Sequence, residues 1–173
     1  MSEWHLIKQK SSYVLDTGLF ELPCLVGRSG LIDSDKKQEG DGATPKGRWP
    51  LRCLYFRPDK INTKTLPASF ALACQPITPD DGWCDDPSSP LYNQLIQLPC
   101  NARHEKLWRD DGLYDLVLPM GYNDQPALPH KGSAIFLHCA EENTRHTQGC
   151  LALAKPDLLM ALNHITATTY IVI

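Results

Sequence analysis

Ser133-Ala134-Ile135-Phe136-Leu137-His138 is the stretch that decides the fold, because its uninterrupted apolar run ends on a histidine. Such a run is typical of a strand buried on both faces, so we expect a strand over 133–138. Cys150, preceded by Gly149, follows twelve residues after His138. The loop between them, 140–147, can double back and bring the thiol to the imidazole.

Short runs of β-branched, aromatic and aliphatic residues lie on both sides of this stretch. They predict strands over 4–8, 12–16, 22–26, 49–56, 116–122 and 168–173. The clearest helix is predicted over 155–162, where Pro156 suits the first turn and Asp157 suits the positive end of the helix dipole. Because strands and helices do not alternate, the pattern indicates a mainly β fold with one or two short helices.

Length and composition indicate one globular domain over 1–173. The chain has 173 residues, of which 42% are hydrophobic and 21% charged, and this excludes a disordered chain. It carries 17 Lys and Arg against 20 Asp and Glu, without a basic cluster, so we expect no nucleic-acid partner. It has no apolar run of about 18 residues, so we expect no membrane partner. Residues 1–10 lack the features of a secretory signal, so we expect a cytoplasmic protein.

The cysteine count argues against a disulfide framework in such a protein, because it is odd. The seven cysteines are Cys24, Cys53, Cys74, Cys84, Cys100, Cys139 and Cys150. No two of them have the C-x-x-C spacing of a structural zinc site. We expect most of them to be small buried side chains.

The His138 and Cys150 pair has the chemistry of an activated cysteine nucleophile. An imidazole beside a thiol can form a thiolate–imidazolium pair, and backbone N–H groups at the Gly149 turn can stabilise an oxyanion. Spacing alone also allows a structural histidine and a buried apolar cysteine. A third possibility is a tetrahedral metal site of His138, Cys139, His146 and Cys150, although adjacent residues of a strand point to opposite faces.

Two motifs resemble the YkuD family of L,D-transpeptidases. The first is 132–138 followed by Thr147-Gln148-Gly149-Cys150, which resembles the catalytic signature of that family. The second is 36–47, which is similar to the element K-x-E-G-D-x-x-T-P-x-G. Shorter fragments at 82–87, 92–93, 104–105, 108–111, 114–115 and 121–123 resemble a small single-domain subgroup, and the matches together span roughly 26–162.

The resemblance implies a β-sandwich of mixed sheets and a cysteine acyltransferase that needs no cofactor or metal. Cys150 would be the nucleophile and His138 the general base. The main chain of Cys139 would orient the ring, and the N–H groups of Gly149 and Cys150 would hold the oxyanion. The bond opened would follow the L-centre of the third residue of a peptidoglycan tetrapeptide, leaving a thioester on Cys150. Carbapenem acylation of Cys150 is also implied.

The outcome of that thioester separates the functional hypotheses. The usual S-H-G-C has become Thr147-Gln148-Gly149-Cys150, and Leu151 stands where an arginine often follows the cysteine. Members without an export signal resemble cytosolic L,D-carboxypeptidases, which remove the terminal D-alanine from muropeptides during peptidoglycan recycling, so we expect that activity. The alternatives are an L,D-transpeptidase that forms crosslinks or exchanges D-amino acids, and a non-catalytic module that binds murein fragments.

A substrate with several carboxylates predicts cationic side chains in the cleft. Arg145 and His146, in the loop before the cysteine, are the first candidates for substrate binding, together with Thr147. Lys46 and Arg109 are further candidates.

Four carboxylates lie next to glycine or proline, and we expect them to fix turns rather than to bind a metal ion or form a catalytic pair. They are Glu39, Asp41, Asp85 and Asp86. Trp83 and Trp108 are expected to fill the core under the loops.

Overall fold

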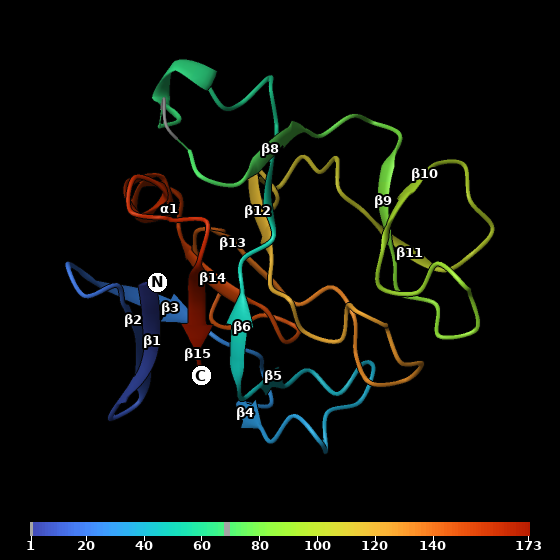
Figure 1. The fold of residues 1–173 in the computed structure, drawn as a ribbon, viewed down its shortest axis with the longest axis horizontal. Coiled ribbons are helices and arrows are strands. Elements are labelled where there is room, and N and C mark those ends of the chain that lie inside the picture. Colours follow the sequence, from blue (N-terminus) through green and yellow to red (C-terminus); the bar gives the residue numbers. More distant parts are fainter. Residues whose placement is uncertain (1, 68–69) are drawn as a thin grey trace.

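The computed structural model describes residues 2–67 and 70–173 of the chain. Within them, ten strands form one mixed sheet (Figure 1). In spatial order these strands are β6 (Arg48–Pro50), β15 (Thr169–Val172), β1 (Ser2–Gln9), β2 (Ser12–Asp16), β3 (Glu21–Leu25), β14 (Leu151–Ala154), β13 (Phe136–Ala140), β12 (Leu116–Pro119), β7 (Cys53–Phe56) and β8 (Ala73–Pro76). The pairs β1–β15, β13–β14 and β7–β8 are parallel.

The large sheet folds back on itself just beyond β6. Leu51 forms a bridge to Met120, and the Arg52 N–H donates to the Pro119 carbonyl at 3.0 Å. These contacts join the β6 edge to the end of β12, so the inner faces enclose a core. The largest fully buried side chains of that core are Trp4, Leu15, Leu54, Leu116, Leu118, Leu137, Leu151, Leu153 and Leu158. The predicted mainly β architecture, consistent with a sandwich, is confirmed.

The helix α1 (Lys155–Leu162) directly follows β14, and its bounds are those predicted. Pro156 lies in its first turn with Asp157, and Leu158 and Leu162 are buried against the core. A single 3₁₀ turn, η1 (Thr63–Thr65), is the other helical element of the described chain.

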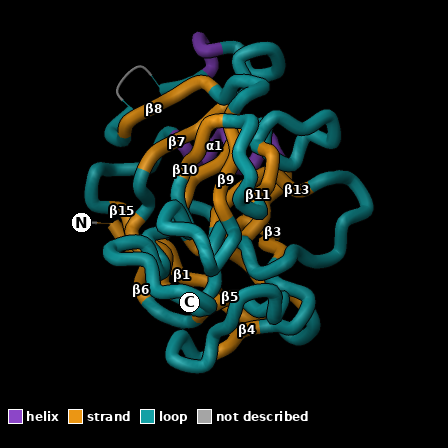
Figure 2. The backbone as a smooth tube through the Cα atoms, turned by 90° about the vertical axis from the view of Figure 1, so that its right-hand side faces the viewer, coloured by secondary structure: helices purple, strands orange, loops and turns teal. Residues whose placement is uncertain are grey.

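A smaller sheet packs against the face of β13 that carries His138. Its strands, in order, are β10 (Leu95–Gln97), β9 (Asp81–Cys84) and β11 (His104–Lys106), which lie beside the large sheet in Figures 1 and 2. Trp83 of β9 packs edge-on against Phe136, with ring centroids 5.0 Å apart. A two-stranded sheet of β4 (Leu31–Ile32) and β5 (Thr44–Pro45) lies under the loop 33–43.

Three predicted strands differ from the observed ones, and the one predicted over 116–122 ends at Pro119. The strand predicted over 49–56 is divided into β6 and β7, because Leu51 bonds to Thr169 on one side while Arg52 bonds to Pro119 on the other. The strand predicted over 133–138 begins only at Phe136. Ala134 has a φ of 52°, which takes the chain out of extended conformation just before the sheet.

Candidate active site

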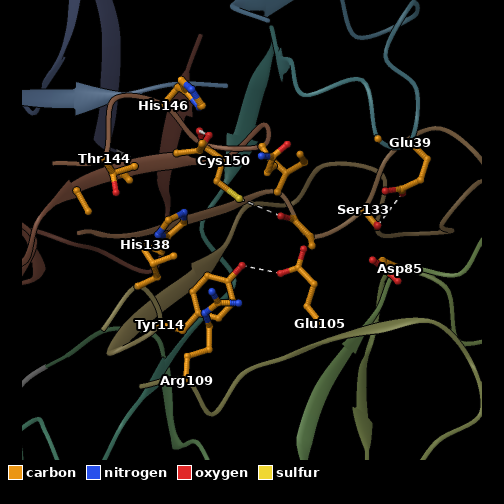
Figure 3. A pocket seen from close by; sticks show the side chains of 18 of the residues that line it. Glu39, Asp85, Glu105, Arg109, Tyr114, Ser133, His138, Thr144, His146 and Cys150 are labelled. Carbon is orange, nitrogen blue, oxygen red and sulfur yellow. Dashed lines mark hydrogen bonds between the residues drawn. The ribbon is translucent and has the colours of Figure 1, made fainter. Parts of the chain in front are cut away.

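The parallel pairing of β13 with β14 brings His138 and Cys150 together. His138 is paired with Ala152 in the register, and alternate side chains of a strand share a face, so Phe136 and His138 point the same way. The backbone N–H of Phe136 donates to the Cys150 sulfur at 3.4 Å. Cys150 therefore lies level with Phe136, one pleat from His138, and Figure 3 shows the thiol beside the imidazole in one cavity.

The His138 ring is held with one nitrogen directed away from the cavity. Its Nδ1 donates to the Cys139 carbonyl at 2.8 Å, so Nε2 is the basic nitrogen. Tyr114 packs edge-on against the ring, with centroids 5.4 Å apart. Burial lowers the pKa of His138 to about 4, and the imidazole is therefore neutral at pH 7. A neutral imidazole whose Nε2 carries no proton can accept one from a neighbouring group.

Cys150 is also neutral in the resting site. Its thiol donates to the Ala134 carbonyl at 3.1 Å, and burial, followed by the charge of Glu105, raises its pKa to about 12. The sequence suggested a thiolate–imidazolium pair, whereas the buried site favours a thiol and a neutral imidazole. In such a site a thiol would lose its proton during nucleophilic attack rather than before it.

The turn before Cys150 is held by the Thr147 side chain. The Thr147 hydroxyl donates to the Cys150 carbonyl at 2.7 Å and accepts from the Gly149 N–H at 3.1 Å. The Gly149 N–H, expected as an oxyanion donor, is thus already bonded. Among the described residues the Cys150 N–H has no acceptor, which leaves it available for an oxyanion. Gly149 has a φ of +132°, and a Cβ there would lie 2.9 Å from the Ala43 carbonyl oxygen.

The glycine-rich segment 36–47 packs against the turn at 147–150. Asp41 accepts from the Ala43 N–H at 2.9 Å and from the buried Lys37 ammonium at 2.6 Å, so it fixes its loop as expected. The Thr44 hydroxyl then donates to the Cys150 carbonyl at 3.5 Å. The second sequence motif therefore packs directly against the first.

A cavity of about 660 Å³ opens over Cys150 and His138. His146 and Thr147 also line it, but Arg145 does not and is exposed in the loop. The hydroxyl of Thr147 is engaged within the turn. The structure thus brings His146 to the cavity as a candidate contact and gives Thr147 a positioning role, while Arg145 lies outside.

Six charged residues of the cavity wall were not expected as a group, and only Arg109 had been a candidate. They are Lys37, Arg103, Arg109, Glu39, Asp85 and Glu105. They come from four separate segments, so sequence spacing gave no signal that they meet. Lys46, the other candidate cation, is exposed and pairs with Asp33 at 3.1 Å.

Glu39 and Asp85 lie across the cavity from His138, and Glu105 lies between them and Tyr114 (Figure 3). Glu39 accepts from the Ser133 hydroxyl at 2.7 Å, and Asp85 accepts from Arg103 at 3.0 Å. Glu105 accepts from the Tyr114 hydroxyl at 2.6 Å, and burial raises the pKa of Glu105. The charge of Glu105 opposes formation of a thiolate at Cys150.

The alternative metal site is not supported by the placement of its side chains. Cys139 packs into the main core, whereas Cys150 packs with Phe136 in the second cluster. Within residues 2–67 and 70–173, no three His, Cys, Asp or Glu side chains are arranged to hold a metal ion. Trp83 is buried as expected, and Trp108 is partly buried beneath the Arg57 guanidinium.

Comparison with known families agrees with this arrangement. The family model YkuD, described as the L,D-transpeptidase catalytic domain, matches residues 6–173. No curated protein matches the chain. In the described part of the chain no helix has the length and apolarity needed to cross a bilayer.

Proposed function

The chain belongs to the YkuD family, the L,D-transpeptidase catalytic domain, and within it we propose a cysteine L,D-carboxypeptidase that removes the terminal D-alanine from murein tetrapeptides. The observation that carries the proposal is the placement of Cys150 beside His138 in one cavity, with Nδ1 of the ring bonded to the Cys139 carbonyl at 2.8 Å. A neutral base beside a neutral thiol in a substrate-sized cavity is suited to acyl transfer.

In the proposed reaction, His138 carries one proton between the reacting groups. Cys150 attacks the carbonyl carbon while Nε2 of His138 takes the thiol proton, and the Cys150 N–H holds the oxyanion. The C–N bond then breaks, and the same proton passes to the amine of the departing D-alanine. Water attacks the thioester, His138 takes its proton, and the sulfur recovers that proton as the tripeptide acid leaves.

The charges of the cavity support two outcomes for the thioester. Lys37, Arg103 and Arg109 match the carboxylates of the tetrapeptide donor, which both outcomes require. The second candidate, transfer to an amine to form a crosslink or to exchange a D-amino acid, is favoured by the carboxylates of Glu39 and Glu105, which attract an ammonium group.

We place the activity in the cytosol, as a step of murein recycling. All seven cysteines are free, including the exposed Cys74, and free thiols are typical of a reducing compartment. Cell fractionation with an antibody to the chain tests this; recovery with periplasmic markers would overturn it.

The activity is tested by incubating the protein with a free tetrapeptide and with the disaccharide tetrapeptide. We expect tripeptide and free D-alanine. The Cys150→Ala variant should release none, and Cys74→Ala, which removes an exposed thiol outside the cavity, should act as wild type. Absence of D-alanine release by the wild type would refute the proposal.

Two additions to this experiment separate the alternatives. With glycine as an acceptor, an exchanged tetrapeptide in place of the tripeptide would indicate transfer. Binding without turnover, unchanged in Cys150→Ala, would indicate a binding module. We also expect a carbapenem adduct on Cys150, detected by mass spectrometry and absent from the Cys150→Ala variant.

A further inference from the structure

Arg109 lines the cavity, and Asp111 fixes one edge of its guanidinium. Its Nε donates to the two Asp111 oxygens at 3.1 and 3.0 Å, and its Nη2 also bonds to Asp111. Among the described residues Nη1 has no acceptor. A guanidinium carries five N–H donors, and its second edge can bind another carboxylate with two parallel hydrogen bonds.

The Arg109 guanidinium lies on the same side of the cavity as the proposed base, His138. The guanidinium lies 5.2 Å from the Tyr114 ring centroid, and that ring packs against His138. Figure 3 shows Arg109 beneath Tyr114, on the His138 side of the cavity and away from Asp85. Arg109 and the base therefore contact the same aromatic ring.

The proposed proton transfer fixes where the terminal carboxylate lies. The departing amine must come within hydrogen-bond distance of His138 Nε2, and the carboxylate of an α-amino acid is two bonds from that nitrogen. The other two cations of the cavity are less suited to bind it. Lys37 is buried against Asp41, and Arg103 is held by Asp85, which lies across the cavity from His138.

We infer that Arg109 binds the free carboxylate of the departing D-amino acid and so determines specificity for a peptide with a free C-terminus. The inference rests on the proposed function, and it names the residue that would restrict the protein to cleavage at a free C-terminus. Asp111 is the positioning residue, because it holds one edge of the guanidinium while its Oδ1 accepts from the Leu113 N–H at 3.1 Å. The binding edge is thus ordered before substrate arrives.

The test compares a D-alanine-terminated tetrapeptide acid with its C-terminal amide. Replacing Arg109 by methionine should lower kcat/KM for the acid about 10- to 100-fold, the range expected for a lost charge-assisted contact. For the amide it should change kcat/KM by less than about threefold, because no charge pair is lost. Arg109→Lys should recover part of the activity on the acid. Arg52→Met is the matched control, since Arg52 forms a similar pair with Asp124 outside the cavity and should leave both substrates unchanged.

A binding measurement separates this inference from the proposed function. In the Cys150→Ala background, calorimetry should show weaker binding of the acid after Arg109→Met and unchanged binding of the amide. Equal losses for acid and amide would mean a structural role and overturn the inference. Equal cleavage of acid and amide by the wild type would overturn it while the proposed function stands. If the wild type releases no D-alanine, the proposed function fails, and the binding comparison alone decides the role of Arg109.

Discussion

The protonation state of the resting pair can be tested by alkylating Cys150 at a series of pH values. Only the thiolate reacts with iodoacetamide, and burial raises the pKa of Cys150 to about 12 from its ordinary 9.0. Burial also lowers the pKa of His138 to about 4, so the imidazole is uncharged at neutral pH and cannot hold a thiolate. The alkylation rate should therefore rise with pH throughout the neutral and mildly alkaline range.

The size of the effect follows from the two pKa values of the thiol. Between 9.0 and about 12 the thiolate fraction at pH 7 falls about a thousandfold. Cys150 should react about a thousand times more slowly than N-acetylcysteine and gain about tenfold per pH unit. The assay quantifies the alkylated Cys150 peptide by mass spectrometry, so the other cysteines do not interfere. The His138→Gln variant should give the same slope.

A rate that is constant from about pH 5 to 8 and loses that plateau in His138→Gln would refute the reasoning. Such a profile is the signature of an ion pair. It would mean that the cavity stabilises the thiolate despite burial and despite the charge of Glu105.

Three further outcomes follow from the same geometry. Gly149→Ala should lower the free energy of unfolding by about 2 kcal/mol and abolish turnover, because φ is +132° and the new Cβ would meet the Ala43 oxygen; unchanged urea denaturation would contradict this. Thr147→Val should lower the free energy of unfolding, measured by urea denaturation, by about 1–3 kcal/mol, because the hydrogen bonds to the Cys150 carbonyl and from the Gly149 N–H are removed. Thr147→Ser keeps the hydroxyl and should restore this free energy. The pKa of His138 is lowered from 6.5 to about 4, so the unfolded chain binds a proton in this pH range that the folded chain does not. The free energy of unfolding should therefore fall by about 3 kcal/mol as the pH drops from 6.5 to about 4. Urea denaturation at these two pH values should show this difference in the wild type and not in His138→Gln.

The overall β fold was accessible from local sequence patterns, whereas the roles of His138 and Cys150 were predicted through the resemblance to the YkuD family. An apolar run ending on His138 predicts a buried strand end, and a glycine before Cys150 predicts a tight turn. Two strands, β9 and β10, were not predicted within the turn-rich segment 78–101. Short strands between proline and aspartate turns carry little hydrophobic periodicity of their own. Their pairing is decided by long-range packing, such as that of Trp83 on Phe136.

Which charged residues line the cavity could not be predicted from the sequence. Arg145 was favoured because it is close to Cys150 along the chain, but its side chain is exposed outside the cavity. Arg109 is distant in sequence, yet the pairing of β13 with β12 and the packing of Tyr114 against His138 bring it to the site. The protonation states of His138 and Cys150 could not be predicted from the sequence either, because they depend on burial by residues from several segments.

Binding of a carboxylate at Arg109 would change the base as well as the substrate's position. Burial lowers the pKa of His138 most, and among the charged groups near the ring Arg109 lowers it further while Asp111 raises it. A substrate carboxylate on the free guanidinium edge adds a second negative charge beside Arg109 and offsets its effect on the imidazole. His138 then binds the thiol proton more strongly when a peptide with a free C-terminus is present. If Arg109 binds the carboxylate as inferred, specificity and activation of Cys150 would be coupled through this arginine.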